Sequence, residues 1–181
     1  MARYRFGEGE YRYFAEPLPE LVATLRGLLY EPLSAIANRW SKALQHDASY
    51  PDHLDEFLAL CRSHGQARPT PLLLRYEAEG YNCLHQDLYG PIHFPLQLTC
   101  LLSEPGQDFA GGEFLLVEQR PRAQSRGHVV PLAQGASVVF PVRERPVPST
   151  RGFTRVQIRH GVSRIRSGER MALGILFHDA T

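Results

Sequence analysis

Apolar residues recur at helical spacing in the first third of the chain. Leucine and valine return every three or four positions over residues 19–30, and Pro32 begins a similar stretch over 32–44. A further stretch over 51–64 has acidic residues in its first turn and is followed by Gly65. Residues spaced in this way share one face of a helix, and proline near the start with glycine at the end is typical of helix boundaries. The pattern predicts three helices, each packing one face against a core.

A different pattern begins at Pro71, where short apolar runs alternate with turns rich in Gly, Pro and Ser. Such runs predict strands. The expected strands are 72–76, 81–87, 96–102, 113–118, 128–132, 136–142, 155–160 and 171–177. Residues 143–152 are expected to form a loop. Short strands at this spacing favour a jelly roll over alternating strands and helices. We therefore predict a mainly β protein with a jelly-roll core and supporting N-terminal α-helices.

The length and composition fit a single globular domain. The 181 residues are 43% hydrophobic and 22% charged, as in ordinary soluble proteins. No apolar run approaches the roughly 18–20 residues of a membrane span, and the N-terminal segment lacks the apolar core of a signal peptide. Three cysteines without metal-type spacing indicate reduced thiols. We expect one domain over 1–181, with helical support over 1–66 and the jelly-roll core over 70–181, in the cytoplasm and without membrane contact.

Arginine is concentrated in the C-terminal half of the chain. The net charge is only +1, but residues 120–170 contain eleven arginines against two acidic residues, Glu144 and Glu169. A local excess of this kind favours an anionic partner, such as a nucleic acid. Arginines on solvated strand faces and loops would give the same pattern, so the charge alone does not decide between the two.

Two histidines and one aspartate form the strongest candidate site. His85 and Asp87 lie on one expected strand, and His160 follows 73 residues later on another. Residues i and i+2 of a strand point to the same side, so His85 and Asp87 can reach one ion. Two imidazoles and one carboxylate occupy three positions of a metal ion and leave others open, as in non-haem Fe(II) oxygenases. The alternative is a hydrogen-bonded core histidine beside a capping aspartate.

An anion-binding pair is expected beside this site. Arg170 stands ten residues after His160, at the start of the last expected strand. A guanidinium there can hold a carboxylate through two parallel hydrogen bonds. Tyr76, on the strand before His85, offers a hydroxyl to the same anion.

Four motifs occur in order, namely H-Q-D at 85–87, F-A-G-G-E-F at 109–114, H-G-V-S-R at 160–164 and G-E-R-M-A-L-G-I at 168–175. In these motifs the chain resembles Fe(II)/2-oxoglutarate-dependent dioxygenases. More narrowly, it resembles a group of bacterial oxygenases predicted to act in oxidative repair of alkylated DNA. The resemblance covers residues 72–180, and the preceding helices are similar to the N-terminal support of prolyl-hydroxylase-like members. It implies a double-stranded β-helix, which is a form of jelly roll.

The resemblance also implies a ligand set. It puts Fe(II) on His85, Asp87 and His160. The implied reaction consumes O2 and 2-oxoglutarate and releases succinate and CO2, with the metal and cosubstrate supplying the oxidative chemistry.

The resemblance puts the distal carboxylate of 2-oxoglutarate on Arg170, with Tyr76 as a second contact. Arg164 is the alternative anchor, since it also lies close to His160 in the sequence. Arg170 is favoured because it stands at the head of the last strand. One departure concerns residues 96–102, where prolyl-hydroxylase-like relatives often carry a tyrosine and this chain has none.

The substrate has several candidates at this point. Alkylated nucleic acid agrees with the arginine excess and with the resemblance, and a protein side chain, as in prolyl hydroxylases, is the second option. A different class is a non-oxidative, cupin-like metal-binding protein, which would not need Arg170 in the metal cavity. We expect residues 76–87 and the loop 143–152 to form the walls of the substrate mouth.

Overall fold

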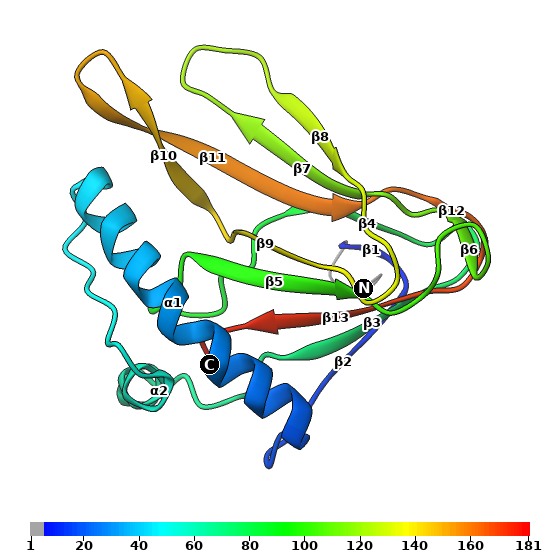
Figure 1. Cartoon of the computed structure of the whole chain (residues 1–181), viewed down its shortest axis with the longest axis horizontal. Helices are drawn as coiled ribbons and strands as arrows, with labels where there is room; N and C mark the ends of the chain where they lie inside the picture. Colours follow the sequence, from blue (N-terminus) through cyan, green and yellow to red (C-terminus); the bar gives the residue numbers. More distant parts are fainter. Residues whose placement is uncertain (1–5) are drawn as a thin grey trace.

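The structure is a computed structural model that describes residues 6–181. The first five residues, part of the N-terminal segment in which we expect no signal-peptide core, lie outside the described residues. Two antiparallel sheets face each other (Figure 1). One contains β1 (Gly7–Glu8), β4 (Tyr81–His85), β7 (Phe114–Gln119), β8 (Arg126–Val130), β10 (Glu144–Ser149) and β11 (Gly152–Val162). The other contains β2 (Glu10–Tyr13), β3 (Leu72–Tyr76), β5 (Leu96–Leu101), β9 (Ser137–Pro141) and β13 (Arg170–Leu176).

The strand order confirms the jelly-roll prediction. The first sheet runs β1-β4-β11-β7-β8, with β10 also paired to β11, and the second runs β2-β3-β13-β5-β9. The short strands β6 (Phe109–Gly111) and β12 (Ile165–Gly168) pair with each other at one end. All eight expected strands are present, with boundaries shifted by a few residues. The two facing sheets form the double-stranded β-helix implied by the resemblance.

Two segments expected outside the sheets form strands instead. The predicted loop over 143–152 contains β10, which pairs with the first half of β11. Its prolines, Pro146 and Pro148, are tolerated because β10 is an edge strand, where a residue without an N–H leaves no partner unsatisfied. The N-terminal residues 7–13, expected in the helical support, form β1 and β2, which extend one sheet each.

The two predicted helices before Tyr50 are a single helix. Helix α1 (Glu20–Leu44) continues through Pro32, which removes a hydrogen bond to the carbonyl of Leu28. Both residues are exposed, so water can satisfy that carbonyl. Helix α2 (Leu54–Ser63) is the third predicted helix, and Gly65 follows it at φ +79. Neither of these helices combines the length and apolar character that crossing a membrane requires.

Both helices cover the outer face of the second sheet (Figure 1). Tyr30 of α1 and Phe57 of α2 stack with ring centroids 5.5 Å apart, and both pack on residues of β5 and β13. Leu173 and Ile175 of β13 face these helices, whereas the alternate residues of the strand face the interior between the sheets. Strand β13 is therefore covered on both faces, and it is the central strand of its sheet and begins at Arg170.

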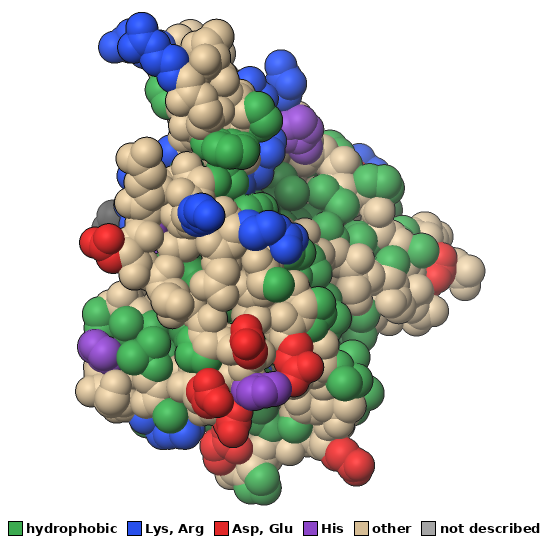
Figure 2. Space-filling view, turned by 60° about the vertical axis from the view of Figure 1, so that its left-hand side comes forward, with side chains coloured by type: hydrophobic (Ala, Val, Ile, Leu, Met, Phe, Trp, Pro, Cys, Tyr) green, Lys and Arg blue, Asp and Glu red, His purple; other side chains and the backbone are tan. Residues whose placement is uncertain are grey.

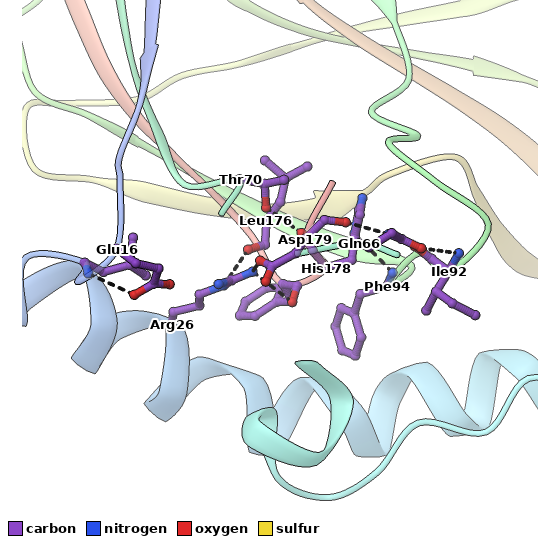
Figure 3. Close-up of polar contacts among 11 residues, drawn as sticks. Glu16, Arg26, Gln66, Thr70, Ile92, Phe94, Leu176, His178 and Asp179 are labelled. Carbon is purple, nitrogen blue, oxygen red and sulfur yellow. Dashed lines mark hydrogen bonds and ion pairs between the residues drawn. The ribbon is translucent and has the colours of Figure 1, made fainter. Parts of the chain in front are cut away.

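A buried polar junction fixes α1 to the end of β13 (Figure 3). The Arg26 guanidinium pairs with Asp179 at 2.8 Å and donates to the carbonyls of Leu176 and Phe177. His178 accepts a hydrogen bond from the backbone N–H of Phe94 through Nδ1, at 3.2 Å. Burial lowers the pKa of His178 to about 3. The imidazole is therefore a neutral structural group in the folded protein.

Candidate active site

The three candidate metal ligands meet between the sheets. His160 of β11 and His85 of β4 are directly opposite each other in the antiparallel register, and their ring centroids are 4.2 Å apart. Asp87 follows β4 by two residues. Its carboxylate oxygens lie 3.4 Å from Nε2 of His85 and 3.2 Å from Nε2 of His160. One ligand atom from each of the three residues lies within 4.8 Å of the others, which is close enough for a single ion.

Hydrogen bonds orient two of these side chains. The Nδ1 of His85 lies 2.7 Å from the carbonyl of Cys83, which leaves Nε2 free to bind a metal. The Tyr89 hydroxyl donates to Oδ1 of Asp87 at 2.7 Å. Orientation of metal ligands by outer partners of this kind is usual in metal sites. No motif in the sequence marks Tyr89 as part of the site.

The surroundings shift the pKa values of the three side chains in different directions. Burial lowers the pKa of His160, whereas at His85 the hydrogen bond and charge of Asp87 outweigh burial and raise the pKa. Burial alone would raise the pKa of Asp87, but the two imidazoles hold it well below its usual range. Asp87 is therefore ionised, as a metal-binding carboxylate must be.

One cavity of about 440 Å³ connects these residues to Arg170 and Tyr76. Arg170 and Tyr76 are register partners on β13 and β3, and both are almost completely buried. Burial lowers the pKa of Arg170 and raises the pKa of Tyr76 to about 12. Within residues 6–181, no carboxylate forms an ion pair with Arg170. A buried cation without a counter-charge costs free energy, so this end of the cavity suits an anion.

Unsatisfied polar atoms support the same conclusion. Four cavity-lining side chains have a buried nitrogen or oxygen without a hydrogen-bond partner among the described residues. They are Asn82, Gln97, His160 and Arg170. Buried polar groups are nearly always paired in folded proteins, so this concentration indicates a polar ligand or a metal. The residues present therefore fit an Fe(II) ion and a dicarboxylate such as 2-oxoglutarate.

The structure also shows which candidates lie elsewhere. Arg164 is exposed and pairs with Glu79 at 3.1 Å, outside the cavity, so it does not fit the role of anchor. His93, six residues after Asp87 in the sequence, lines a small separate cavity. On β5, where a tyrosine is absent, Gln97 and Thr99 face the cavity. On this strand, two polar side chains therefore face the cavity where the relatives often carry a tyrosine.

The residues that line the cavity differ in part from those expected around the substrate mouth. Residues 76–87 contribute to the cavity wall, but none of residues 143–152 does. Instead, Tyr11 and Tyr13 of β2 line the cavity together with Tyr89 and Arg68. The rings of Tyr13 and Tyr89 meet edge to face, with centroids 6.5 Å apart. The alternation Tyr-Arg-Tyr in this segment is the sequence signal that could have identified a strand with an aromatic face.

Comparisons with known proteins agree with this geometry. A model of a family described as an oxygenase, catalysing oxidative methylation of damaged DNA, matches residues 9–180. Two uncharacterized proteins from two strains of Mycobacterium tuberculosis are each 52% identical to the chain over 167 residues, which is 92% of this chain and 72% of theirs.

A solved structure shares the fold. The crystal structure of a Pseudomonas putida prolyl-4-hydroxylase superposes with a TM-score of 0.50 and 16% identity, covering 98% of this chain and 75% of that one. Identity this low establishes the fold and nothing more specific. The family match extends over nearly the whole described chain. The chain belongs to this oxygenase family.

Proposed function

We propose that the chain binds Fe(II) through His85, Asp87 and His160 and oxidises its substrate with 2-oxoglutarate and O2. The observation that carries this proposal is the convergence of the three ligands in one cavity with Arg170, a buried cation without a carboxylate partner among residues 6–181. A cupin-like protein without oxidative chemistry would have no use for this guanidinium. When bound, the iron and 2-oxoglutarate supply the oxidation: with O2, 2-oxoglutarate is converted to succinate and CO2, and one oxygen atom enters a C–H bond of the substrate.

The residues of the chain hold and orient these components. The ionised carboxylate of Asp87 and the two imidazoles bind the metal and leave positions open for other ligands. Arg170 binds the distal carboxylate of 2-oxoglutarate, and its bidentate geometry fixes the direction of the molecule. The Tyr76 hydroxyl, which accepts a hydrogen bond from Asn82 at 3.2 Å, is a second donor to that carboxylate. Apolar side chains such as Phe114 and Phe140 exclude water from the rest of the cavity.

We propose alkylated nucleic acid as the substrate class. The family description names damaged DNA. Lys and Arg side chains gather over the upper part of one face of the protein, whereas most acidic side chains on that face lie lower down (Figure 2). Cationic side chains supply the phosphate contacts on which most nucleic-acid affinity depends. The tyrosines that line the cavity offer aromatic surfaces for an unpaired base.

The test is succinate formation from 2-oxoglutarate, measured with Fe(II) and O2 present and with each omitted in turn. We expect turnover to require both and to increase with a methylated oligonucleotide. His85→Ala and Asp87→Ala should abolish it and should also weaken binding of Mn(II) measured by anaerobic calorimetry. His128→Ala, which removes an exposed histidine on β8, is the matched control.

Two results would contradict the proposal. Normal turnover in either ligand variant would show that the metal binds elsewhere. Stimulation of turnover by methylated peptides and not by oligonucleotides would retain the oxygenase chemistry and reject the nucleic-acid substrate.

A further inference from the structure

A second groove lies outside the candidate active site, between the C-terminal half of α1 and the β10–β11 hairpin. It has a volume of about 710 Å³. Arg39 and Lys42 of α1 line one side, and Arg151, Phe153 and Arg155 line the other. No acidic residue lines the groove. Lys42 is the only lysine of the chain.

Three of the four cationic side chains are available to a ligand. Arg155 lies 3.3 Å from Glu144 and also contacts His46, so its charge is already partly neutralised. Arg39, Lys42 and Arg151 are exposed, and within residues 6–181 none of them lies within ion-pair distance of a carboxylate. Cations brought together without counter-charges repel one another, so this arrangement is stabilised by an anionic partner.

An exposed aromatic ring lies beside these charges. Phe153 is 55% exposed at the start of β11, next to Arg151 at the hairpin turn. An apolar ring of this size in water has no role in the core. Proteins that bind single-stranded nucleic acids combine a cationic groove that follows the backbone with aromatic side chains on which bases stack. The bases of a duplex are already stacked, so an accessible ring favours an unpaired strand.

The groove and the candidate active site share one strand. β11 carries Phe153 near one end and His160 near the other, and it extends past the end of β4 at His85. The β7–β8 hairpin runs alongside it, and both hairpins project from the same side of the barrel (Figure 1). Seven residues of strand span about 23 Å, which equals the rise of roughly seven stacked nucleotides.

We propose that this groove binds single-stranded nucleic acid, with phosphates on Arg39, Lys42 and Arg151 and a base stacked on Phe153. The inference rests on the proposed function, since it supplies the substrate class with an anchor remote from the metal. The anchor contributes affinity and leaves the chemistry in the cavity unchanged. A strand that occupies both sites must be several nucleotides long.

The test is fluorescence anisotropy of a labelled 12-nucleotide oligothymidylate with the full chain, over a series of salt concentrations. Each phosphate contact on a single strand contributes about 0.7 to the slope of log K against log salt, so R39Q/K42Q/R151Q should lower the slope by about 2. Counterion release alone then reduces affinity about 50-fold at roughly 0.15 M salt. Phe153→Ala should weaken binding about 5- to 150-fold without changing the slope.

The matched control removes three exposed arginines outside the groove, in R12Q/R62Q/R166Q. This control changes the net charge by the same amount as the groove variant. We expect its slope of log K against log salt to stay within about 0.7 of the wild-type slope, which corresponds to about one phosphate contact. An unchanged slope in the groove variant, or an equal loss in the control, would overturn the proposal. Tighter binding of duplex than of single strand, independent of Phe153, would also overturn it.

The outcome is separable from that of the proposed function. His85→Ala should bind the oligonucleotide as the wild type does, because the groove is distinct from the cavity. The groove variant could lose affinity for the oligonucleotide while the wild type forms no succinate from 2-oxoglutarate. That result would support the proposed binding groove and reject the proposed oxygenase mechanism.

Discussion

Replacement of Arg170 by methionine separates the binding role of this arginine from a structural one. Methionine has a similar length and no charge, and its flexible side chain fills irregular space. In the folded protein Arg170 is 2% exposed, its Nε has no hydrogen-bond partner among residues 6–181, and burial lowers its pKa. Without a bound anion, the buried guanidinium therefore destabilises the folded state. We expect Arg170→Met to raise the free energy of unfolding of the protein measured without 2-oxoglutarate.

The same substitution should greatly weaken binding of 2-oxoglutarate. Loss of one partner of a buried, hydrogen-bonded charge pair costs about 2–5 kcal/mol. At about 1.4 kcal/mol for each factor of ten, this corresponds to a loss of affinity of roughly 30- to 4000-fold. Because binding of a ligand to the native state stabilises it, the increase in melting temperature with 2-oxoglutarate should disappear as well.

Both effects can be measured by thermal unfolding under anaerobic conditions with Mn(II), with and without 2-oxoglutarate. Arg164→Met is the control, because Arg164 is exposed and its ion pair with Glu79 is on the surface. An exposed pair of this kind contributes about 0–1 kcal/mol, so both readouts should stay close to the wild type.

The reasoning would be refuted by either of two results. If Arg170→Met unfolds more easily without ligand and still responds to 2-oxoglutarate, the arginine supports the fold and does not bind the cosubstrate. If Arg164→Met loses the response instead, the anchor is on the other arginine.

Three further predictions concern the surroundings of the site. Tyr89→Phe removes the hydrogen bond to Asp87 and should weaken Mn(II) binding about 10- to 100-fold, as calorimetry would show; unchanged affinity would remove Tyr89 from the site. Gly112→Ala should reduce 2-oxoglutarate affinity, because Gly112 has φ +63 and a Cβ there would overlap Ile165 and approach Cδ of Arg170 to 3.0 Å. Gly106→Ala, at φ +84 with open space around it, should cost only stability; equal losses of affinity in both variants would reject the steric argument. Finally, the pKa of His178 is about 3 in the folded protein and roughly 6.5 in the unfolded chain, so between these values mainly the unfolded state binds the proton. The stabilising contribution of the neutral His178 to the free energy of unfolding is therefore complete above pH 6.5 and decreases as the pH falls toward 3. At pH 5 the loss is about 2 kcal/mol, and His178→Asn should remove this part of the acid sensitivity in urea unfolding curves; an identical pH dependence in the variant would contradict it.

Local sequence patterns were sufficient for eight of the strands and for half of the candidate site. The apolar runs and the turn residues between them located all eight expected strands, because alternation and turn chemistry are properties of neighbouring residues. The spacing of His85 and Asp87 placed both on one side of an extended segment for the same reason. The predictions at two prolines, Pro32 and Pro146 in β10, were wrong, because the effect of proline depends on whether the missing hydrogen bond faces water.

The remaining features depend on pairing between distant parts of the chain. Alternation shows which residues share a face, but it does not show what covers that face. Only the register of β11 on β4 brings His160 to His85, and only the register of β13 on β3 puts Arg170 beside Tyr76 while Arg164 remains at the surface. The tyrosines that line the cavity and the groove beside α1 likewise require segments far apart in sequence to meet. The sequence by itself therefore determined the eight expected strands and the chemistry of the candidate ligands. The tertiary structure decided which side chains share a cavity, because that depends on long-range contacts that no local pattern encodes.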